Sequence, residues 1–394
     1  MTTGEDSATP SPLAVAAALA LAAAVSLGLA RFSYALLLPA MRADLGWSYF
    51  TAGAMNTVNA AGYLTGALLA PAILRRLDAR HFMLAGGVGA AVLMALHAVT
   101  RDDAVLYVLR WACGVTSAAS FVGGGLLAAR LAQRAPQRSG LVLGIYYGGV
   151  GLGIVACALG LPPLLDAPAL GWPAAWVALG ALAGAFTVAT AAATGSLAAP
   201  PAAGAPRAPF GWRPFAIGLA GYGMFGIGYI GYMTFIITLL REQGMGAGTV
   251  MAFYVLLGLG VVASSWVWAG LLQRHRGGLP LSLLNGLLAL ATALPLWSGG
   301  VGAAFVSGAL FGGVFLSVVA STTALVRHNT PPAAWPAGIA AFTIVFAFGQ
   351  IVGPSLVGWI ADGPGGLSRG FALSAAALAL GSVLAALQRP VGGR

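Results

Sequence analysis

The chain of 394 residues is 59% hydrophobic and only 7% charged. A water-soluble domain carries about a quarter charged residues, so this composition excludes an ordinary soluble enzyme or binding domain and predicts an integral membrane protein. The net charge of +10 arises from 19 basic residues, all of them arginine, against 9 acidic ones.

Apolar segments separated by charged or Pro/Gly-rich breaks predict twelve membrane-spanning helices, because a bilayer requires about 20 residues per span. The first six are expected at 13–40, 50–74, 82–100, 104–129, 139–164 and 172–194. The second six are expected at 214–240, 247–272, 279–298, 300–326, 336–361 and 368–387. The fold class expected is therefore an all-α membrane protein, with twelve transmembrane helices in two pseudo-symmetric six-helix bundles.

The same breaks set the expected domain boundaries. We predict bundles at 13–195 and 213–388, an Ala/Pro-rich linker at 196–212, and cytoplasmic tails at 1–12 and 389–394. The first tail is polar and acidic and has neither a basic segment nor a cleavage site. The segment that follows it is therefore predicted to be the first span and not a removable signal peptide.

The arginines outside the apolar segments are distributed unevenly between the two sides of the membrane. Thirteen lie in the loops after even-numbered spans, in the linker or in the C-terminal tail, whereas only Arg42, Arg101, Arg241 and Arg369 lie in the opposite loops. Arginine-rich loops stay on the cytoplasmic side. The asymmetry predicts a multi-pass protein of the cytoplasmic (inner) membrane with both termini in the cytoplasm, and it accounts for the positive charge without a nucleic-acid partner.

The two halves of the chain repeat each other at a nearly constant offset. Gly28, Arg31 and Tyr34 in span 1 correspond to Gly226, Tyr229 and Tyr232 in span 7, 198 residues later. Gly114 in span 4 matches Gly312 in span 10 at the same offset. Two homologous bundles related by an axis along the membrane normal are an architecture of alternating-access carriers.

Several motifs resemble those of the major facilitator superfamily. The segment from Arg110 to Gly114 resembles the superfamily's RxxxG motif, and LRRLDAR at 74–80 resembles its cytoplasmic loop signature. The segments GLARFSYALLLPAM at 28–41 and FGQIVGPSLVGWIAD at 348–362 are similar to the YbfB/YjiJ-type branch. The resemblance covers essentially the whole chain and implies a monomeric secondary transporter whose spans 1, 4, 7 and 10 line a central cavity.

The chain also departs from that pattern. The loop signature's usual aspartate at the end of span 2 is missing, with Leu74 or Arg75 near its place. Span 5 is glycine-rich but lacks the Gly-Pro of the antiporter motif. Neither the usual gating charge pair nor an exchange mechanism can therefore be carried over from the resemblance.

Two arginines lie inside predicted spans, Arg31 in span 1 and Arg110 in span 4. A charge at membrane depth is costly and by default marks a pathway or binding site. With a rise of 1.5 Å per residue, Arg31 lies about 16 Å and Arg110 about 10 Å from the outer ends of their helices. Because the apolar spans contain no carboxylate, an organic anion is the expected counter-ion. The alternative is that backbone carbonyls and water satisfy each arginine.

Polar and aromatic residues on other spans extend the candidate site. Tyr229 and Tyr232 lie on one face of span 7, Tyr34 follows Arg31 by three residues, and Asn59 and Gln350 lie inside spans 2 and 11. We predict that these residues contact substrate together with the two arginines. The competing interpretation is that they hold helices together, which is the more common role of aromatic stripes and intramembrane amides.

Catalytic and cofactor-binding motifs do not occur in the sequence, so no enzyme activity and no cofactor are predicted. Cys113 and Cys157 lie in apolar spans without metal-ligand spacing, and no metal is expected. A gradient must then drive transport. A co-transported proton would ride on the substrate, or on His97, Asp44 or Asp362.

These observations favour a secondary transporter of a small organic anion, working by proton-linked symport or anion exchange. One alternative is an efflux transporter of hydrophobic compounds, which the glycine-rich span 5 and the aromatic residues favour. The other is a membrane receptor or scaffold that transports nothing.

Overall fold

The computed structural model describes residues 11–167, 169–195, 197 and 208–391. In this part of the chain, eleven helices are long and apolar enough to cross a membrane. The remaining predicted span, span 2, corresponds to the 25-residue helix α3 (Tyr49–Ile73). Its two asparagines and three threonines explain its greater polarity. The predicted tail at 1–12 and linker at 196–212 fall mostly outside the described residues.

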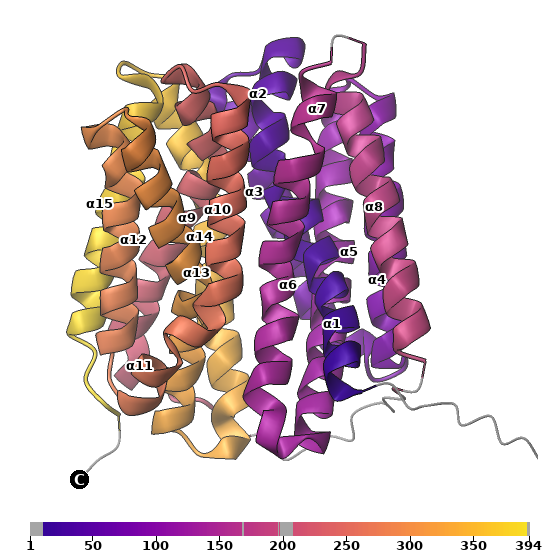
Figure 1. Ribbon diagram of the computed structural model, residues 1–394. Helices are drawn as coiled ribbons and strands as arrows, with labels where there is room; N and C mark the ends of the chain where they lie inside the picture. The colour runs from indigo at the N-terminus through magenta and orange to yellow at the C-terminus, as the bar shows by residue number, and fades with distance from the viewer. Residues whose placement is uncertain (1–10, 168, 196, 198–207, 392–394) are drawn as a thin grey trace, which may run out of the picture.

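The helices follow one another with short connections (Figure 1). The first half comprises α1 (Pro12–Ala23), the π-helix η1 (Ala24–Phe32), α2 (Tyr34–Leu45), α3, α4 (Ala79–Leu96), α5 (Asp103–Arg134), α6 (Ser139–Gly160), α7 (Pro162–Leu165) and α8 (Gly171–Ala193). The second half comprises α9 (Ala216–Glu242), α10 (Ala247–Val267), α11 (Ala269–Arg274), α12 (Leu279–Trp297), α13 (Val301–Asn329), α14 (Trp335–Ala361) and α15 (Gly366–Ala386). Single 3-10 turns η2 to η5 lie at His97–Val99, Pro136–Arg138, Arg213–Phe215 and Pro332–Ala334.

These bounds agree with the predicted spans to within a few residues at nearly every end. Spans 1, 5 and 8 are less regular than the sequence suggested, and span 5 is broken at Leu161 into α6 and α7. Span 1 contains a π-helical segment between α1 and α2, and span 8 is broken after Val267 into α10 and α11.

The two halves lie side by side and meet along three helix pairs (Figure 1). Helix α3 packs against α14, α10 packs against α6, and α2 packs against α9. In span numbers these are 2 with 11, 8 with 5, and 1 with 7, so each contact has its counterpart under exchange of the halves. The interface therefore has the two-fold pseudo-symmetry that the repeat predicts.

Two glycines show the repeat at atomic detail. A Cβ atom on Gly114 would lie 2.2 Å from the carbonyl oxygen of Asn59, and one on Gly312 would lie 2.1 Å from that of Leu257. Leu257 lies 198 residues after Asn59, the offset found in the sequence. Small residues at these equivalent crossings allow two helix backbones to approach closely in each half.

Spans 1 and 7 are the central helices of the molecule. In their most apolar windows 72% and 83% of residues are buried, against 28–61% in the other spans of the described chain. Arg31 and Tyr229 lie on these two spans. The repeat-related pair therefore lies on the helices least exposed to lipid.

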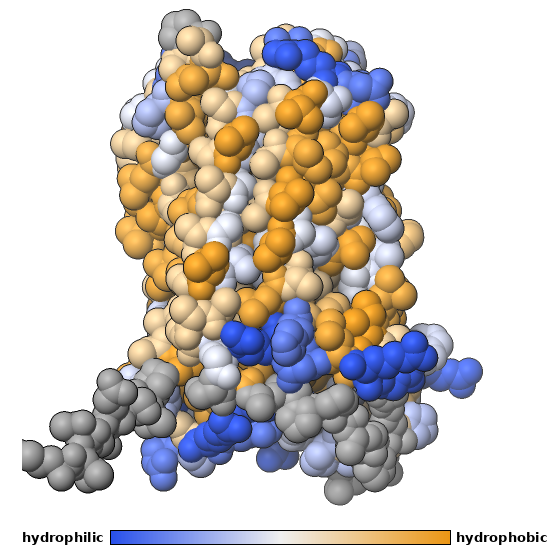
Figure 2. Space-filling view, turned by 90° about the vertical axis from the view of Figure 1, so that its right-hand side faces the viewer, coloured by the Kyte–Doolittle hydropathy of each residue, from blue (hydrophilic) through white to orange (hydrophobic). Residues whose placement is uncertain are grey.

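An apolar band covers the outside between two polar ends (Figure 2). One end, here called the acidic end, carries six carboxylates: Asp44, Asp102, Asp103, Asp166, Glu242 and Asp362. The other, here called the arginine-rich end, carries the loops after even-numbered spans.

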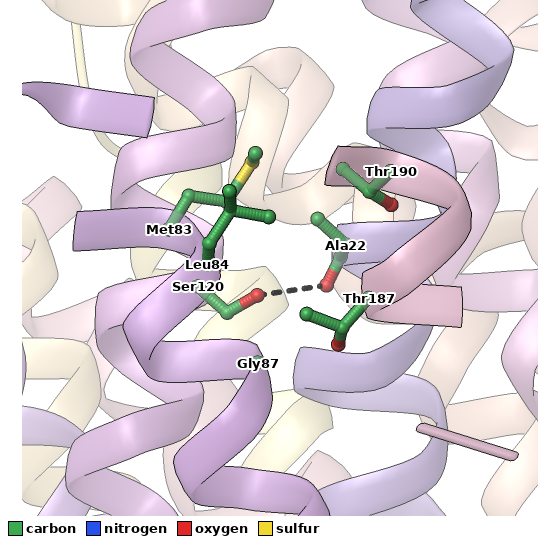
Figure 3. A pocket seen from close by; sticks show the side chains of 7 residues that line it. All are labelled: Ala22, Met83, Leu84, Gly87, Ser120, Thr187 and Thr190. Atoms are coloured by element: carbon green, nitrogen blue, oxygen red, sulfur yellow. Dashed lines mark hydrogen bonds between the residues drawn. The ribbon is translucent and has the colours of Figure 1, made fainter. Parts of the chain in front are cut away.

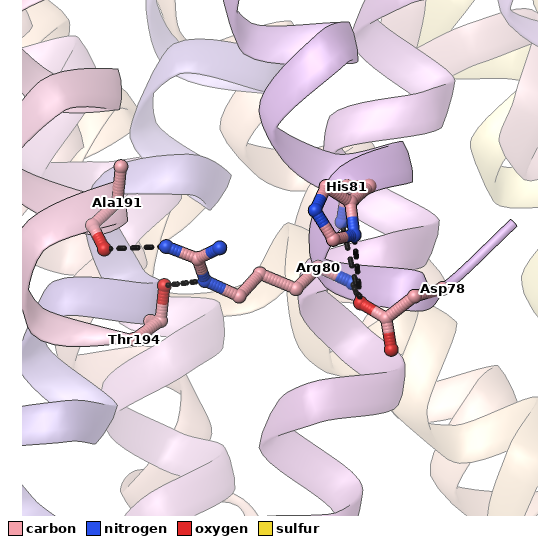
Figure 4. A network of polar contacts seen from close by, with 5 residues as sticks. All are labelled: Asp78, Arg80, His81, Ala191 and Thr194. Atoms are coloured by element: carbon pink, nitrogen blue, oxygen red, sulfur yellow. Dashed lines mark hydrogen bonds and ion pairs between the residues drawn. The ribbon is translucent and has the colours of Figure 1, made fainter. Parts of the chain in front are cut away.

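At this end Arg80 binds the C-terminus of α8 (Figure 4), because its Nη2 donates to the Ala191 carbonyl at 2.8 Å and its Nε to Thr194 Oγ1 at 3.3 Å.

Candidate functional site

Arg31 projects from the π-helix η1, which interrupts span 1 near the middle of the membrane. The wider turn is visible in the hydrogen bond from Ser33 N–H to the Gly28 carbonyl, five residues back, at 3.0 Å. Gly28 allows this segment to lie against α6, since a Cβ atom on it would come within 2.6 Å of Gly153 Cα. Tyr254 of the opposite half donates its hydroxyl to the Phe32 carbonyl at 2.6 Å. Such π-helical turns occur frequently at functional sites.

Arg31 itself is only 4% exposed and connects the two halves. Its Nη2 donates to Oε1 of Gln350 on α14, and its guanidinium carbon lies 5.9 Å from the ring centre of Tyr63 on α3. Its Nε has no hydrogen-bond partner among the described residues. No carboxylate pairs with Arg31 in the part of the chain that the structure describes. Arg31 is thus a buried positive charge that has no carboxylate partner and keeps one donor unbonded within the described chain.

Arg110 is in a different situation, although it is also buried, at 1% exposure. Its Nη1 donates to the Ala30 carbonyl at 3.2 Å, its Nη2 to Asn56 Oδ1 at 3.3 Å, and its Nε to the Met55 carbonyl at 3.4 Å. Its guanidinium carbon also lies 4.6 Å from the ring centre of Tyr34. Every nitrogen of this guanidinium thus has a protein partner, which supports a role in holding η1, α3 and α5 together.

The predicted residues Tyr34, Asn59 and Tyr232 are all buried and bound to protein groups. Tyr34 donates its hydroxyl to the Ala52 carbonyl at 2.8 Å, and Asn59 Nδ2 donates to the Arg110 carbonyl at 3.0 Å. The Tyr232 hydroxyl shares a hydrogen bond of 2.7 Å with Ser307 Oγ, within the second half. These contacts support helix packing for the three residues in this conformation. The structure brings Asn59, Arg110 and Tyr34 into contact within the first half, whereas Arg31 and Gln350 are the predicted pair that it joins across the two halves.

Tyr229 lies within a stack of nearly parallel aromatic rings. Its ring centre is 4.7 Å from that of Phe225, 5.5 Å from that of Phe346 and 6.0 Å from that of Phe315, with interplanar angles of 19°, 21° and 10°. Phe225 and Phe346 also stack on each other at 5.3 Å. The stack lies beside Arg31, because Phe346 is one helical turn before Gln350 on the same face of α14.

The side-chain hydrogen bonds that join the halves lie mainly on the acidic side of Arg31. On its arginine-rich side α6 and α10 also contact each other, since a Cβ atom on Gly144 would lie 3.1 Å from Trp266 Nε1. The carboxylate of Asp362, just after α14, accepts hydrogen bonds from the backbone N–H groups of Tyr49 and Phe50 at the start of α3, at 2.7 and 2.9 Å. The Tyr49 hydroxyl also donates to Glu242, at the end of α9.

Three further polar contacts join the halves on this side of the molecule. Asn56 Nδ2 donates to Thr234 Oγ1 at 2.7 Å, and Thr57 Oγ1 donates to the Ile351 carbonyl at 2.7 Å. Arg241 forms an ion pair of 3.8 Å with Asp166. Within the described chain, the side-chain hydrogen bonds between the halves lie between the acidic end and the level of Arg31. The two bundles are therefore closed against each other at that end.

The three candidate proton carriers have structural partners. His97 is buried and stacks on Trp176 at 4.3 Å, and its Nδ1 is 2.7 Å from the Leu93 carbonyl. Asp44 accepts a hydrogen bond from Trp172 Nε1 at 2.7 Å and pairs with Arg101 at 3.2 Å. In the described chain, Arg31 is not among the hydrogen-bond partners of these residues or of Asp362.

A gap too small to hold a water molecule lies within the first half, away from Arg31 (Figure 3). The residues around it are Ala22, Met83, Leu84, Gly87, Ser120, Thr187 and Thr190. Their hydroxyl groups bind backbone carbonyls: Ser120 Oγ that of Ala22 at 3.4 Å, and Thr190 Oγ1 that of Ala18 at 2.9 Å. This space is a packing gap between α1, α4, α5 and α8.

The sequence reasoning missed two residues of the site. Phe346 could have been found, because it lies four residues before Gln350 and shares its helix face. Tyr254 could not, since its hydrogen bond to the Phe32 carbonyl depends on how the two halves meet.

Comparison with family models identifies the chain. A model described as "Uncharacterised MFS-type transporter YbfB" matches residues 23–386. The chain belongs to this family. It is therefore a multi-pass membrane transporter and not an enzyme, as the motifs had predicted. A comparison with curated proteins finds no match.

Solved structures of two transporters share the fold. A bacterial homolog of the human lysosomal transporter Spinster, in an inward-facing and unoccupied conformation, is 14% identical, with a TM-score of 0.69 over 96% of both chains. The nucleoside transporter NupG is 14% identical, with a TM-score of 0.70 over 94% of this chain and 97% of its own. A mutant form of NupG gives a TM-score of 0.71 at 13% identity, over 94% and 98% of the chains. At this level of identity the likeness concerns the fold alone.

Proposed function

We propose that this transporter moves a small organic anion across the cytoplasmic membrane and binds it at Arg31. The observation that carries the proposal is the Arg31 guanidinium itself, which is buried between the halves, has no carboxylate partner in the described chain and keeps Nε unbonded. A charge at the centre of a span costs about 3 kcal/mol on insertion scales. An anionic substrate would offset that cost during each transport cycle.

The placement of Arg31 between the halves suits alternating access. A ligand bound there would contact span 1 of the first half and Gln350 of the second, so rocking of one half against the other would change its access. Because the side-chain hydrogen bonds between the halves gather toward the acidic end, we expect the halves to separate first at the arginine-rich end. By the positive-inside rule that end is cytoplasmic, and so are both termini.

Two modes of coupling fit the arrangement: symport of the anion with a proton, and exchange for another anion. In both, the positive charge of Arg31 is neutralised by the ligand and not by a carboxylate of the protein. Counterflow in proteoliposomes separates them, because exchange requires an anion on the opposite side whereas symport requires a pH gradient.

The function is tested by transport in proteoliposomes containing the purified protein. Uptake of radiolabelled organic anions is compared for the wild type, Arg31→Ala and Arg31→Lys. We expect loss of uptake in Arg31→Ala and poor rescue in Arg31→Lys, because an ammonium group cannot reproduce the planar fork of a guanidinium. Full uptake of organic anions by Arg31→Ala would contradict binding at Arg31, whereas transport of uncharged hydrophobic compounds alone would favour the efflux alternative.

A further inference from the structure

We propose that the substrate is a monoanion, consisting of one carboxylate attached to a flat apolar group. This inference rests on the proposed function and narrows it. Two observations support it. One buried guanidinium retains an unbonded donor for a ligand, and aromatic rings lie beside that guanidinium.

The charge count comes from the unequal positions of the two buried arginines. Arg110 donates from Nε, Nη1 and Nη2 to the oxygens of Met55, Ala30 and Asn56, so a ligand could bind it only by displacing contacts that hold the first half together. Arg31 donates to Gln350 and retains Nε. A second negative charge on the substrate would be buried without a cation of its own, which is strongly unfavourable.

The form of the anionic group follows from the donors at Arg31. A guanidinium presents parallel N–H groups that match the two oxygens of a carboxylate. Gln350, already bound to Arg31 through Oε1, carries N–H donors on the same amide group. A carboxylate at this position would therefore bind one residue from each half of the transporter.

The body of the substrate is inferred from the aromatic rings beside this pair. Tyr63 lies 5.9 Å from the Arg31 guanidinium carbon, and Phe346 stacks on Tyr229 and Phe225 with interplanar angles of 21° and 8°. Tyr63 and Phe346 are partly exposed, whereas Tyr229 and Phe225 are buried. The two partly exposed side chains described beside Arg31 and Gln350, Tyr63 and Phe346, are thus both aromatic, and aromatic rings stack on flat apolar groups. A strongly hydroxylated body would lose hydrogen bonds to water and find few partners here.

The test compares three probes against the purified transporter in nanodiscs: benzoate, acetate and phthalate. Dissociation constants are measured by isothermal titration calorimetry for the wild type, Arg31→Gln, Phe346→Leu and Phe348→Leu. Phe348 is the matched control, because it lies two residues from Phe346 on α14, and so on another face of the helix, and is 67% exposed. We expect benzoate to bind about tenfold more tightly than acetate or phthalate, a difference of about 1.4 kcal/mol.

In Phe346→Leu, benzoate affinity should fall about fivefold, within the range of an aromatic contact, while acetate affinity should not change. Phe348→Leu should behave as the wild type. Phthalate binding as tight as that of benzoate would contradict the monoanion, and acetate binding as tight as that of benzoate would contradict the flat apolar body. Both results leave the proposed function intact if Arg31→Gln abolishes binding. Carboxylate binding that survives Arg31→Gln unchanged would instead overturn the proposed function itself.

Discussion

The carboxylate of Asp362 binds the first backbone N–H group of α3, that of Tyr49, at 2.7 Å. The two residues are 313 positions apart and belong to different halves. A helix begins with unsatisfied N–H groups that a carboxylate can cap. Ser48 of the same half accepts from Thr51 N–H at 3.1 Å, and Asp362 adds a second cap from the opposite bundle. This second cap must break when the halves separate at the acidic end.

Removing this cap should favour the conformation that is open at the acidic end. Loss of a helix-capping contact costs about 1–2 kcal/mol. A change of this size in the free-energy difference between the closed and the open conformation changes their ratio roughly tenfold. The measurement is the labelling rate of Thr57→Cys, which lies at the α3–α14 interface, by a membrane-impermeant thiol reagent. We expect faster labelling in the Asp362→Ala background.

Asp102→Ala provides the matched control. Asp102 also caps a helix at the acidic end, but its Oδ1 accepts from Val105 of its own helix α5, at 2.9 Å. Its loss should lower stability without increasing labelling of Thr57→Cys. Equal acceleration by both substitutions would show that Asp362 does not hold the halves together.

Arg110 and Arg31 should respond differently to substitution. Arg110→Ala removes three hydrogen bonds inside the first half and should lower the free energy of unfolding by about 3 kcal/mol. Arg31→Gln should leave the melting temperature nearly unchanged while abolishing anion binding. The stability of the two variants is measured by thermal unfolding in detergent. Normal stability of Arg110→Ala would contradict the structural role of Arg110.

Close packing at the repeated glycines provides a test of the fold. Gly312→Ala should destabilise the second half by about 1–3 kcal/mol, because its Cβ would lie 2.1 Å from the Leu257 carbonyl oxygen. The adjacent Gly313 has open space around it, so Gly313→Ala should be neutral or slightly stabilising. Comparable melting temperatures for the two variants would argue against the α10–α13 crossing.

We expect Tyr229 to contribute to stability through its ring and to ligand binding through its hydroxyl. Tyr229→Ala should lower stability by about 3–5 kcal/mol, since it removes a buried aromatic ring that stacks on three others. Tyr229→Phe keeps the stack and should weaken ligand binding by about 1 kcal/mol if one hydrogen bond is lost. Melting temperature and dissociation constant are measured on the same preparations. Unchanged affinity in both variants would assign Tyr229 to packing alone.

The sequence predicted the fold well because the membrane imposes a strong pattern on it. Apolar segments of span length located the helices, and the offset between Gly114 and Gly312 revealed a repeat that the structure reproduces at two helix crossings. The interruption of span 1 escaped prediction, since Ala24–Phe32 carries no local signal for a π-helix. Its carbonyls at Ala30 and Phe32 are bound by Arg110 and Tyr254, which only the assembled fold brings near.

The sequence also predicted part of the candidate site, because polar residues are conspicuous within apolar spans. Residue type alone identified Arg31, Arg110 and Gln350 as costly polar groups in apolar spans. It could not distinguish Arg31 from Arg110, because the difference lies in three oxygens on other helices. Only the arrangement of the helices shows which guanidinium retains an unused donor.

The central claim is that Arg31 recognises negative charge on the substrate. It is tested most directly by comparing the affinities of the wild type and Arg31→Gln for benzoate and for benzamide, its uncharged analogue of nearly the same shape. We predict that the wild type binds benzoate at least about tenfold more tightly than benzamide, and that this preference falls to about one in Arg31→Gln because only the charged ligand loses its partner. A preference for benzoate that persists undiminished in Arg31→Gln would contradict the claim.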